Sequence, residues 1–502
     1  MKMVKSLILG SAAGLIAMSG AQAADLPVKA KAVEYVRICS LYGAGFYYIP
    51  GTDTCIKLGG YLRVDTTFNG SGNYNDPAWN GASGQGNRYR NQYIAYSRQD
   101  LNIDTRTATE YGVVRTFFDA TFNWGSGGSY GVSTGIAGGA IGVYYAFIQF
   151  AGFTMGKAVS QFSTPWTGYP GNATSFLIGG EDDVTGINQL AYTASFGNGV
   201  TASISLEDQS AYRQSQILNV STPQTIASSL VLGALNQNSG ASAYGGNSVP
   251  DIVGQIRVDQ AWGLFQLSGA LHDVYAGYYN PTLETSGHPS TVWGGAVMAA
   301  LSIKNIPTGP GDSINMDATW ANGASRYVIG GVSPNSFGMF GSSGLPGVYQ
   351  SIAFGASADG IFGLNGSIEK NTAWGFRGAF NHNWNPAWTT SLFGSYSSET
   401  YSTNGKVLFC QGLAQVFAGA AGTTSCNPNF TIAQIGTRTA WTPVKNLTFS
   451  TEIMYTQLHS SMSGVTGPIS LNVAGSTKPP GVAYEFKDQG TFTGLVRAQR
   501  VF

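Results

Sequence analysis

The sequence is poor in charge. Only 10% of its 502 residues are Asp, Glu, Lys or Arg, whereas about 25% is usual for a soluble domain. The 26 basic residues are balanced by 26 acidic ones, so the basic surplus typical of nucleic-acid-binding proteins is missing and no nucleic-acid partner is expected. Long hydrophobic runs are also missing: beyond residue 23, no stretch of 18 or more apolar residues predicts a transmembrane helix.

Histidine is scarce as well. The four histidines are His272, His288, His382 and His459, and none lies in a catalytic motif such as GxSxG or HExxH. A hydrolytic barrel enzyme would need a nucleophile with a histidine partner, or an Asp/His set. We therefore expect no enzymatic activity, no catalytic residue, no metal site and no cofactor.

Glycine and aromatic residues are abundant instead. The chain has 69 Gly, 26 Tyr, 26 Phe and 10 Trp, too many aromatics for a disordered protein. Its mean hydropathy is −0.01, well below that of a helical membrane protein. This combination favours a large protein made of β-strands.

The first 23 residues predict a secretory signal peptide. They read MKMVKSLILGSAAGLIAMSGAQA, with Lys2 and Lys5 before an apolar stretch and a small-x-small cleavage site at residues 21–23. A membrane anchor is the alternative, but the stretch is short and no stop-transfer pattern follows it. The chain is therefore predicted to be exported and to begin at Ala24 after cleavage.

Four cysteines follow the signal peptide. An exported chain meets an oxidising environment, which favours two disulfides. Proximity pairs Cys39 with Cys55 and Cys410 with Cys426, although three connectivities are open in principle. A zinc site is the weaker alternative, because no CxxC motif or nearby histidine supports it.

Strict alternation of apolar and polar residues predicts the strands. In residues 57–68, Leu58, Leu62 and Val64 share one face, while Arg63 and Asp65 share the other. About 16 such segments follow one another, near residues 56–68, 93–106, 112–124, 141–150, 153–158, 187–196, 199–207, 251–260, 263–274, 291–303, 312–321, 372–384, 388–401, 430–441, 445–458 and 490–502.

Connections between these strands alternate in length. Long loops such as 69–92 and 208–250 are separated by short turns such as 197–199 and 385–387. An outer-membrane β-barrel has this rhythm, with long extracellular loops, short periplasmic turns and an even number of strands. A membrane offers no water to satisfy the backbone, so without a long apolar helix only a closed sheet can span it.

The polar face of each strand would then look into the barrel. Unpaired charges are too costly for a dry core, and a barrel of about 16 strands leaves an aqueous lumen. The sequence therefore predicts an all-β, transmembrane antiparallel barrel over residues 56–502, with hydrated charges inside. Residues 24–55 before it are predicted to form an N-terminal periplasmic segment, either a plug or a contact between protomers.

Three segments resemble the alphaproteobacterial porin family. They are YVRICSLYGAGFYYIPGTDTCIKLGGYLRVD (35–65), INQLAYTASFGNGVTASISLED (187–208) and LVRAQRVF (495–502). The resemblance extends from end to end of the mature chain. It implies a 16-stranded, homotrimeric outer-membrane channel for passive diffusion of small hydrophilic solutes and ions. It also implies that the third long loop folds into the lumen and narrows it.

That third loop covers residues 159–186 and contains Glu181, Asp182 and Asp183 in succession. On the first three strands, the positions that would face the lumen include the cationic residues Arg63, Arg98, Arg106 and Arg115. Carboxylates on the loop facing arginines on the wall would set a transverse field that tunes ion selectivity. Two other interpretations stay open: a solvated tip for the acidic trio, and wall positions away from the narrowest point for the arginines.

A general diffusion porin is thus the leading hypothesis, located in the bacterial outer membrane in contact with its lipid. A substrate-specific channel for a sugar or an anion is the alternative, and Tyr61, Phe117 and Phe393 are aromatic residues with inward parity. A barrel adhesin that displays its long loops is the third.

Overall fold

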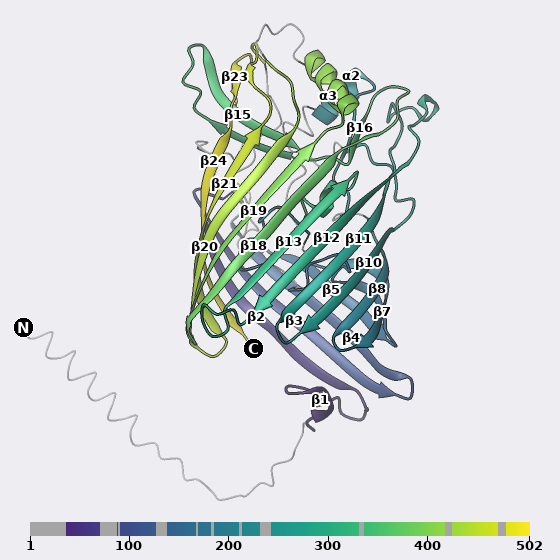
Figure 1. The fold of residues 1–502 in the computed structure, drawn as a ribbon, viewed down its shortest axis with the longest axis vertical. Coiled ribbons are helices and arrows are strands. Elements are labelled where there is room, and N and C mark those ends of the chain that lie inside the picture. Colours follow the sequence, from purple (N-terminus) through teal and green to yellow (C-terminus); the bar gives the residue numbers. More distant parts are fainter. Residues whose placement is uncertain are drawn as a thin grey trace, which may run out of the picture.

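The computed structural model describes residues 37–70, 88, 91–126, 138–166, 169–181, 185–209, 213–230, 242–330, 336–416, 424–469 and 478–502. Its main body is one antiparallel sheet that closes on itself, because the first wall strand, β2 (Cys55–Phe68), pairs with the last, β24 (Gln489–Val501). Figure 1 shows the resulting barrel, with its strands inclined to the long axis.

Sixteen strands form the wall. Between β2 and β24 these are, in chain order, β3 (Tyr93–Thr109), β4 (Gly112–Gly125), β5 (Ala140–Phe150), β6 (Phe153–Ala158), β7 (Ile187–Gly197), β8 (Val200–Glu207), β10 (Asp251–Gln260), β11 (Gly263–Val274), β12 (Val292–Lys304), β13 (Ser313–Asn322), β18 (Thr372–Asn385), β19 (Trp388–Thr400), β20 (Phe430–Val444) and β21 (Leu447–Ser460). The predicted closed antiparallel barrel of 16 strands is confirmed, and each predicted strand overlaps one of these.

Alternation along each strand separates the two faces. On β21, Phe449 and Ile453 are exposed on the outside, whereas Glu452 and Thr456 are buried inside. Because successive side chains point to opposite faces of a sheet, one face can meet lipid while the other meets the interior. The same alternation on β2 exposes Leu62 and buries Asp65, as the sequence predicts.

Short turns gather at one end of the barrel and long loops at the other (Figure 1). In the turn between β7 and β8, Asn198 and Gly199 have φ of 49° and 74°, a left-handed conformation that glycine and asparagine tolerate best. A Cβ on Gly199 would lie 1.9 Å from the backbone oxygen of Asp259, so this turn requires glycine.

The long-loop end carries regular structure in segments that the sequence predicts as loops. It comprises a four-stranded sheet of β14 (Ser336–Gly341), β15 (Val348–Ala356), β23 (Ala483–Phe486) and β22 (Gly464–Val465), a three-stranded sheet of β9 (Ile217–Asn219), β16 (Gly360–Phe362) and β17 (Glu369–Lys370), the helices α2 (Pro223–Ile226) and α3 (Thr403–Val416), and the 3-10 turns η4 (Glu284–Ser286) and η5 (Ser325–Tyr327).

Part of this structure has its own hydrophobic core. Leu218, Phe354, Ile361, Phe409 and Tyr484 are buried in one cluster. A disulfide from Cys410 of α3 to Cys426, with a Cα–Cα distance of 5.8 Å, ties the helix to the chain that follows. In the part of the chain that the structure describes, no helix has both the length and the apolar character needed to cross a membrane.

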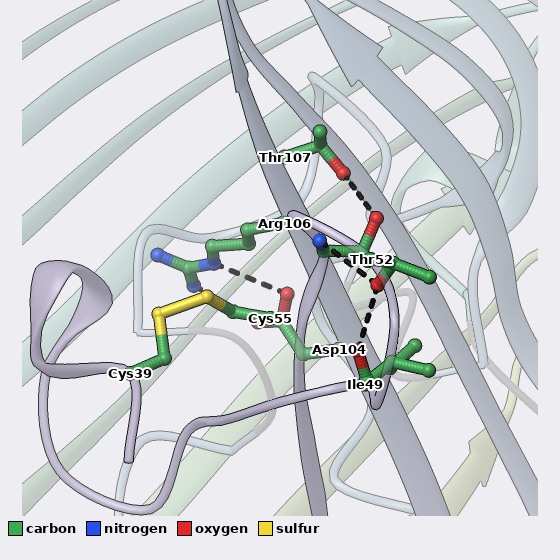
Figure 2. The surroundings of a disulfide bond; sticks show 8 residues. Cys39, Ile49, Thr52, Cys55, Asp104, Arg106 and Thr107 are labelled. Atoms are coloured by element: carbon green, nitrogen blue, oxygen red, sulfur yellow. Dashed lines mark hydrogen bonds and ion pairs between the residues drawn. A yellow bond between two sulfur atoms is a disulfide. The ribbon is translucent and has the colours of Figure 1, made fainter. Parts of the chain in front are cut away.

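At the short-turn end, residues 37–54 form a compact N-terminal segment containing η1 (Ser40–Tyr42) and β1 (Tyr47–Tyr48). A disulfide joins Cys39 to Cys55, the first residue of β2, with a Cα–Cα distance of 6.1 Å (Figure 2). Both disulfides of the structure are those that sequence proximity favours. The predicted signal peptide, residues 1–23, lies outside the described residues.

The barrel interior has two unlike sides. Along the wall strands from β8 to β21, away from their short-turn ends, inward side chains contact inserted loop segments, and we call this the packed side. Phe162, Ile178 and Tyr327 share one fully buried cluster with Met298 and Ala321 of the wall. Along β2–β4, which we call the open side, the inward Arg63, Arg106 and Arg115 keep part of their surface exposed, whereas Arg98 is buried. The predicted third loop thus supplies part of the filling.

Candidate functional site

The third long loop is fastened to the inner wall through its backbone. The amides of Ala173 and Thr174 both donate to the Glu452 carboxylate of β21, the latter over 3.0 Å. The amide of Ile178 donates to Gln434 Oε1 of β20 over 2.7 Å. Buried polar groups of this kind stabilise a structure when each has its partner, so the loop is held inside the barrel at several points.

Glu181 closes this loop with a buried ion pair. Its Oε1 lies 3.0 Å from Nη1 of Arg213, and Nη2 of the same guanidinium lies 3.2 Å from Glu207 of β8. All three side chains are fully buried, and the Arg213 guanidinium lies over the ring of Tyr327, 4.7 Å from its centroid. Glu181 is therefore an anchor of the loop, and its charge is shielded from the lumen water.

Arg213 and Tyr327 were not predicted as site residues. Arg213 lies in a long loop without periodicity, so nothing in the sequence pairs it with Glu181. Burial and the nearby Asp251 carboxylate raise the pKa of the Tyr327 hydroxyl well above its usual value. That hydroxyl remains a donor and bonds to Asp251 over 2.6 Å. Asp182 and Asp183, the other two acidic residues predicted for the loop, lie outside the described residues.

A second buried ion pair lies beneath the loop. Nε of Arg377, on β18, is 3.1 Å from Asp317 of β13, and both side chains are almost completely buried. The same guanidinium donates to the backbone oxygen of Glu181 over 3.3 Å. Charges on this side therefore hold the loop in place.

Two of the four predicted wall arginines lie level with each other on the open side. Arg63 of β2 and Arg98 of β3 are direct partners in the strand register. Nε of Arg63 lies 3.4 Å from Asp65, whose carboxylate also binds Arg497 at 2.7 Å. We call Arg63 and Arg98 the mid-barrel pair. Arg497 has inward parity on β24, so parity alone would have added it to the predicted set.

The other two arginines lie near the short-turn end. Arg106 and Arg115 are register partners on β3 and β4, and we call them the rim pair. Eight residues separate Arg98 from Arg106 along β3, which is about 27 Å at the usual rise of a strand. The four predicted arginines therefore fall at two levels of the barrel, not one.

Comparison with known proteins assigns the family. Residues 25–495 match the family described as a porin subfamily. The chain belongs to this family. Among curated proteins, the porin Omp2b of Brucella suis biovar 1 is 39% identical over 216 residues, which are 41% of this chain and 54% of that protein. Omp2b of Brucella melitensis biotype 1 is 38% identical over the same shares.

This chain spans about half the length of the curated relatives it matches. Among solved structures, the outer membrane channel DcaP of Acinetobacter baumannii matches with a TM-score of 0.55 and 15% identity, over 91% of this chain and 99% of that one. That likeness concerns the fold alone. Family and fold together place this porin in the outer membrane, so the short-turn end is periplasmic and the long-loop end is extracellular.

Proposed function

We propose that this porin forms a water-filled channel through which small hydrophilic solutes and ions diffuse passively. The observation that carries the proposal is the open side, where the side chains of Arg63, Arg106 and Arg115 are 12, 29 and 28% exposed on the inner face of the barrel. Guanidinium groups left partly exposed inside a closed sheet need water around them. A dry barrel would bury and pair every such charge, as the packed side does.

The proposal includes a constriction formed by the third loop, residues 159–186. In it, Asp182 and Asp183 of the loop and the arginines of the wall act together on passing ions, while the buried Glu181 anchors the loop. Support comes from the anchoring of the loop to Glu452 and Gln434 inside the barrel. Within the arginine set, the mid-barrel pair is the better placed to act at this level, and the rim pair acts at the periplasmic mouth.

We further propose the organisation of the whole chain. Residues 1–23 are a cleaved signal peptide, residues 24–55 are a periplasmic segment and residues 56–502 are the membrane-spanning barrel. The resemblance of its N-terminal and C-terminal segments to alphaproteobacterial porins supports a homotrimer. Chemical cross-linking of the purified protein, resolved by mass, tests the trimer, and a single protomer band at all cross-linker concentrations would contradict it.

A substrate-specific channel for an anion is the second candidate. It is favoured by the aromatic rings beside the arginines: the Cζ of Arg98 lies 5.0 Å from the ring centroid of Tyr144, and that of Arg115 lies 5.0 Å from the ring of Phe117. Rings that hold a guanidinium in place prepare it for a ligand.

Liposome swelling separates the two candidates. Proteoliposomes are placed in isotonic solutions of a graded series of neutral sugars, and of small anions matched to them in size. A general porin gives uptake that falls smoothly with solute size in both series. One solute, or the anions as a class, standing far above the size curve would contradict general diffusion and favour the specific channel. Equal swelling with and without protein would contradict both.

A further inference from the structure

At the periplasmic mouth, the rim pair forms one side of a pocket. The pocket has a volume of about 560 Å³, within the usual range for small-molecule sites. It is lined by Tyr42 of the N-terminal segment and by residues from the periplasmic ends of five strands and one turn, namely Arg106, Val113, Arg115, Gln149, Phe150, Ala151, Gly152, Phe153, Thr154 and Thr193. Among the described residues that line it, none is acidic.

The charge balance of the rim pair leaves one positive charge. Arg106 and Arg115 both bind one carboxylate, that of Asp104, with nitrogen–oxygen distances of 2.9 and 3.0 Å. Because the two guanidinium groups share a single carboxylate, that carboxylate cannot accept from all of their N–H donors. Nη1 of Arg106 has no hydrogen-bond acceptor among the described residues, and Nη1 of Arg115 uses only the amide oxygen of Gln149, at 3.0 Å.

Both guanidinium groups of the rim pair make cation–π contacts with aromatic rings. The Cζ of Arg115 lies 5.0 and 5.5 Å from the ring centroids of Phe117 and Phe147, and the Cζ of Arg106 lies 4.9 Å from that of Phe46. Stacking of this kind reduces the freedom that a side chain would lose on binding a ligand. Figure 2 shows the Arg106 side chain beside the Cys39–Cys55 disulfide, with its guanidinium joined to Asp104.

The N-terminal segment completes the pocket. Tyr42 lines it, and the Tyr42 hydroxyl is a buried oxygen with no hydrogen-bond partner among the described residues. The disulfide between Cys39 and Cys55 holds this segment against the first wall strand. A donor without an acceptor, next to two cations, is suited to an oxygen atom of a bound anion.

We propose that this pocket binds a small organic carboxylate. A carboxylate matches the bidentate geometry of arginine donors, and the apolar side chain of Val113, which has the same inward parity as Arg115, offers a surface for a short branched hydrocarbon. The site is periplasmic and separate from the proposed constriction, so it goes beyond diffusion through the channel. Its ligand is recognised by charge at one end and by apolar surface at the other.

Binding to the purified full-length protein in detergent tests this proposal, because no gradient or conducting channel is needed. Dissociation constants from ligand-observed NMR titrations are compared for isovalerate, its neutral amide isovaleramide, and acetate. Isovalerate should bind at least about tenfold more tightly than isovaleramide, because the amide loses the charge-assisted hydrogen bonds. Acetate should bind more weakly than isovalerate, because it lacks the branched chain. Equal affinity for isovalerate and its amide would overturn the proposal.

Variants locate the binding. Arg115→Gln should weaken isovalerate binding about tenfold, whereas Arg257→Gln should leave it unchanged. Arg257 is a matched control because it also faces inward near the periplasmic end of its strand and pairs with an aspartate two residues away, Asp259, at 3.3 Å. Unchanged affinity in Arg115→Gln would overturn the site.

A second pair of variants keeps both arginines in place. Val113 is 43% exposed at the start of β4, so Val113→Asp and Val113→Asn should both fold, as circular dichroism will verify. The two differ in charge alone, and only Val113→Asp should weaken isovalerate binding strongly. If both variants bind isovalerate equally, the pocket is not the site.

Discussion

On the packed side of the barrel interior, inward side chains contact inserted loop segments and have almost no exposed surface, whereas on the open side the inward Arg63, Arg106 and Arg115 remain partly exposed. Met298 and Ala321 of the packed side are completely buried, while the side chains of Arg106 and Arg115 are 29 and 28% exposed. Both sides are made of the same alternating strands. What differs is whether a loop segment lies against them.

The charged side chains of the interior also differ between the packed side and the open side. On the packed side, Arg213 and Arg377 bind buried carboxylates and fix the position of the third loop. A buried pair adds little net stability over an apolar one, but removing one partner is costly, because the other is left buried and charged. On the open side, Arg63, Arg106 and Arg115 are partly exposed, and in the proposed channel their charges would act on solutes. The same residue type thus serves as a buried anchor on one side and is partly exposed on the other.

The largest expected effect is that of Arg213→Met. Removing this cation leaves Glu181 and Glu207 buried without it, and we expect a loss of about 3–5 kcal/mol in the free energy of unfolding. Denaturant unfolding in detergent, followed by tryptophan fluorescence, measures it. Single-channel conductance should rise at the same time, because the third loop loses an anchor.

The matched control is Arg257→Met on the partly exposed pair with Asp259, where about 1 kcal/mol or less is expected. If Arg213→Met and Arg257→Met cost the same, Arg213 is solvated as Arg257 is, and the distinction between a packed and an open side is wrong.

A smaller loss is expected for Glu452→Gln. The Glu452 carboxylate accepts the amides of Ala173 and Thr174, and replacing a charged acceptor by a neutral one should cost about 1–2 kcal/mol. Backbone hydrogen exchange should accelerate in residues 169–178. Glu369→Gln is the control, because that carboxylate lies outside the barrel wall and binds Ser402 and Asn404. Faster exchange in the control, or none in Glu452→Gln, would contradict the anchoring role.

The open side is the part that sequence could predict. Alternation over about ten residues assigns each wall strand and its inward face, so Arg63, Arg98, Arg106 and Arg115 were all placed on the inner face. Alternation does not give the height of a residue in the barrel, because strand tilt and register are set by the partner strands. For that reason the rim pair and the mid-barrel pair could not be separated from sequence.

The packed side could not be predicted, for a different physical reason. Loop segments have no periodicity, and their positions depend on contacts between residues far apart in the chain. Glu181 and Arg213 are an example, because no sequence feature near either residue indicates a buried ion pair. A run of acidic residues in a loop would instead be expected at a solvent-exposed position. The sheets and α3 at the extracellular end were missed in the same way, since short strands between glycine-rich segments leave little pattern.

The next prediction tests whether the open side acts on ions. An ion passing at about 4 Å from a unit charge in water gains about 1 kcal/mol, which changes its local concentration roughly fivefold. Arg63→Gln, which removes the partly exposed member of the mid-barrel pair, should therefore shift the reversal potential of a planar bilayer under a salt gradient toward cation selectivity. Arg500→Gln is the control, because Arg500 is exposed, has outward parity and binds the backbone of Lys445. Equal shifts in the two variants would mean that the effect does not arise in the lumen.

The smallest effect is expected for the double variant Asp182→Asn, Asp183→Asn. This variant is also the most direct test of the predicted constriction. Glu181 is kept, because its replacement would also break the buried pair with Arg213 and confuse stability with selectivity. If the two aspartates face the ion path, the reversal potential should shift toward anions, opposite in sign to that of Arg63→Gln, with unfolding unchanged. The shift should shrink as salt rises from 0.1 to 1 M, since the Debye length falls from about 10 to about 3 Å. An unchanged reversal potential at low salt would place both aspartates away from the ion path and leave the arginines of the open side as the charges that act on it.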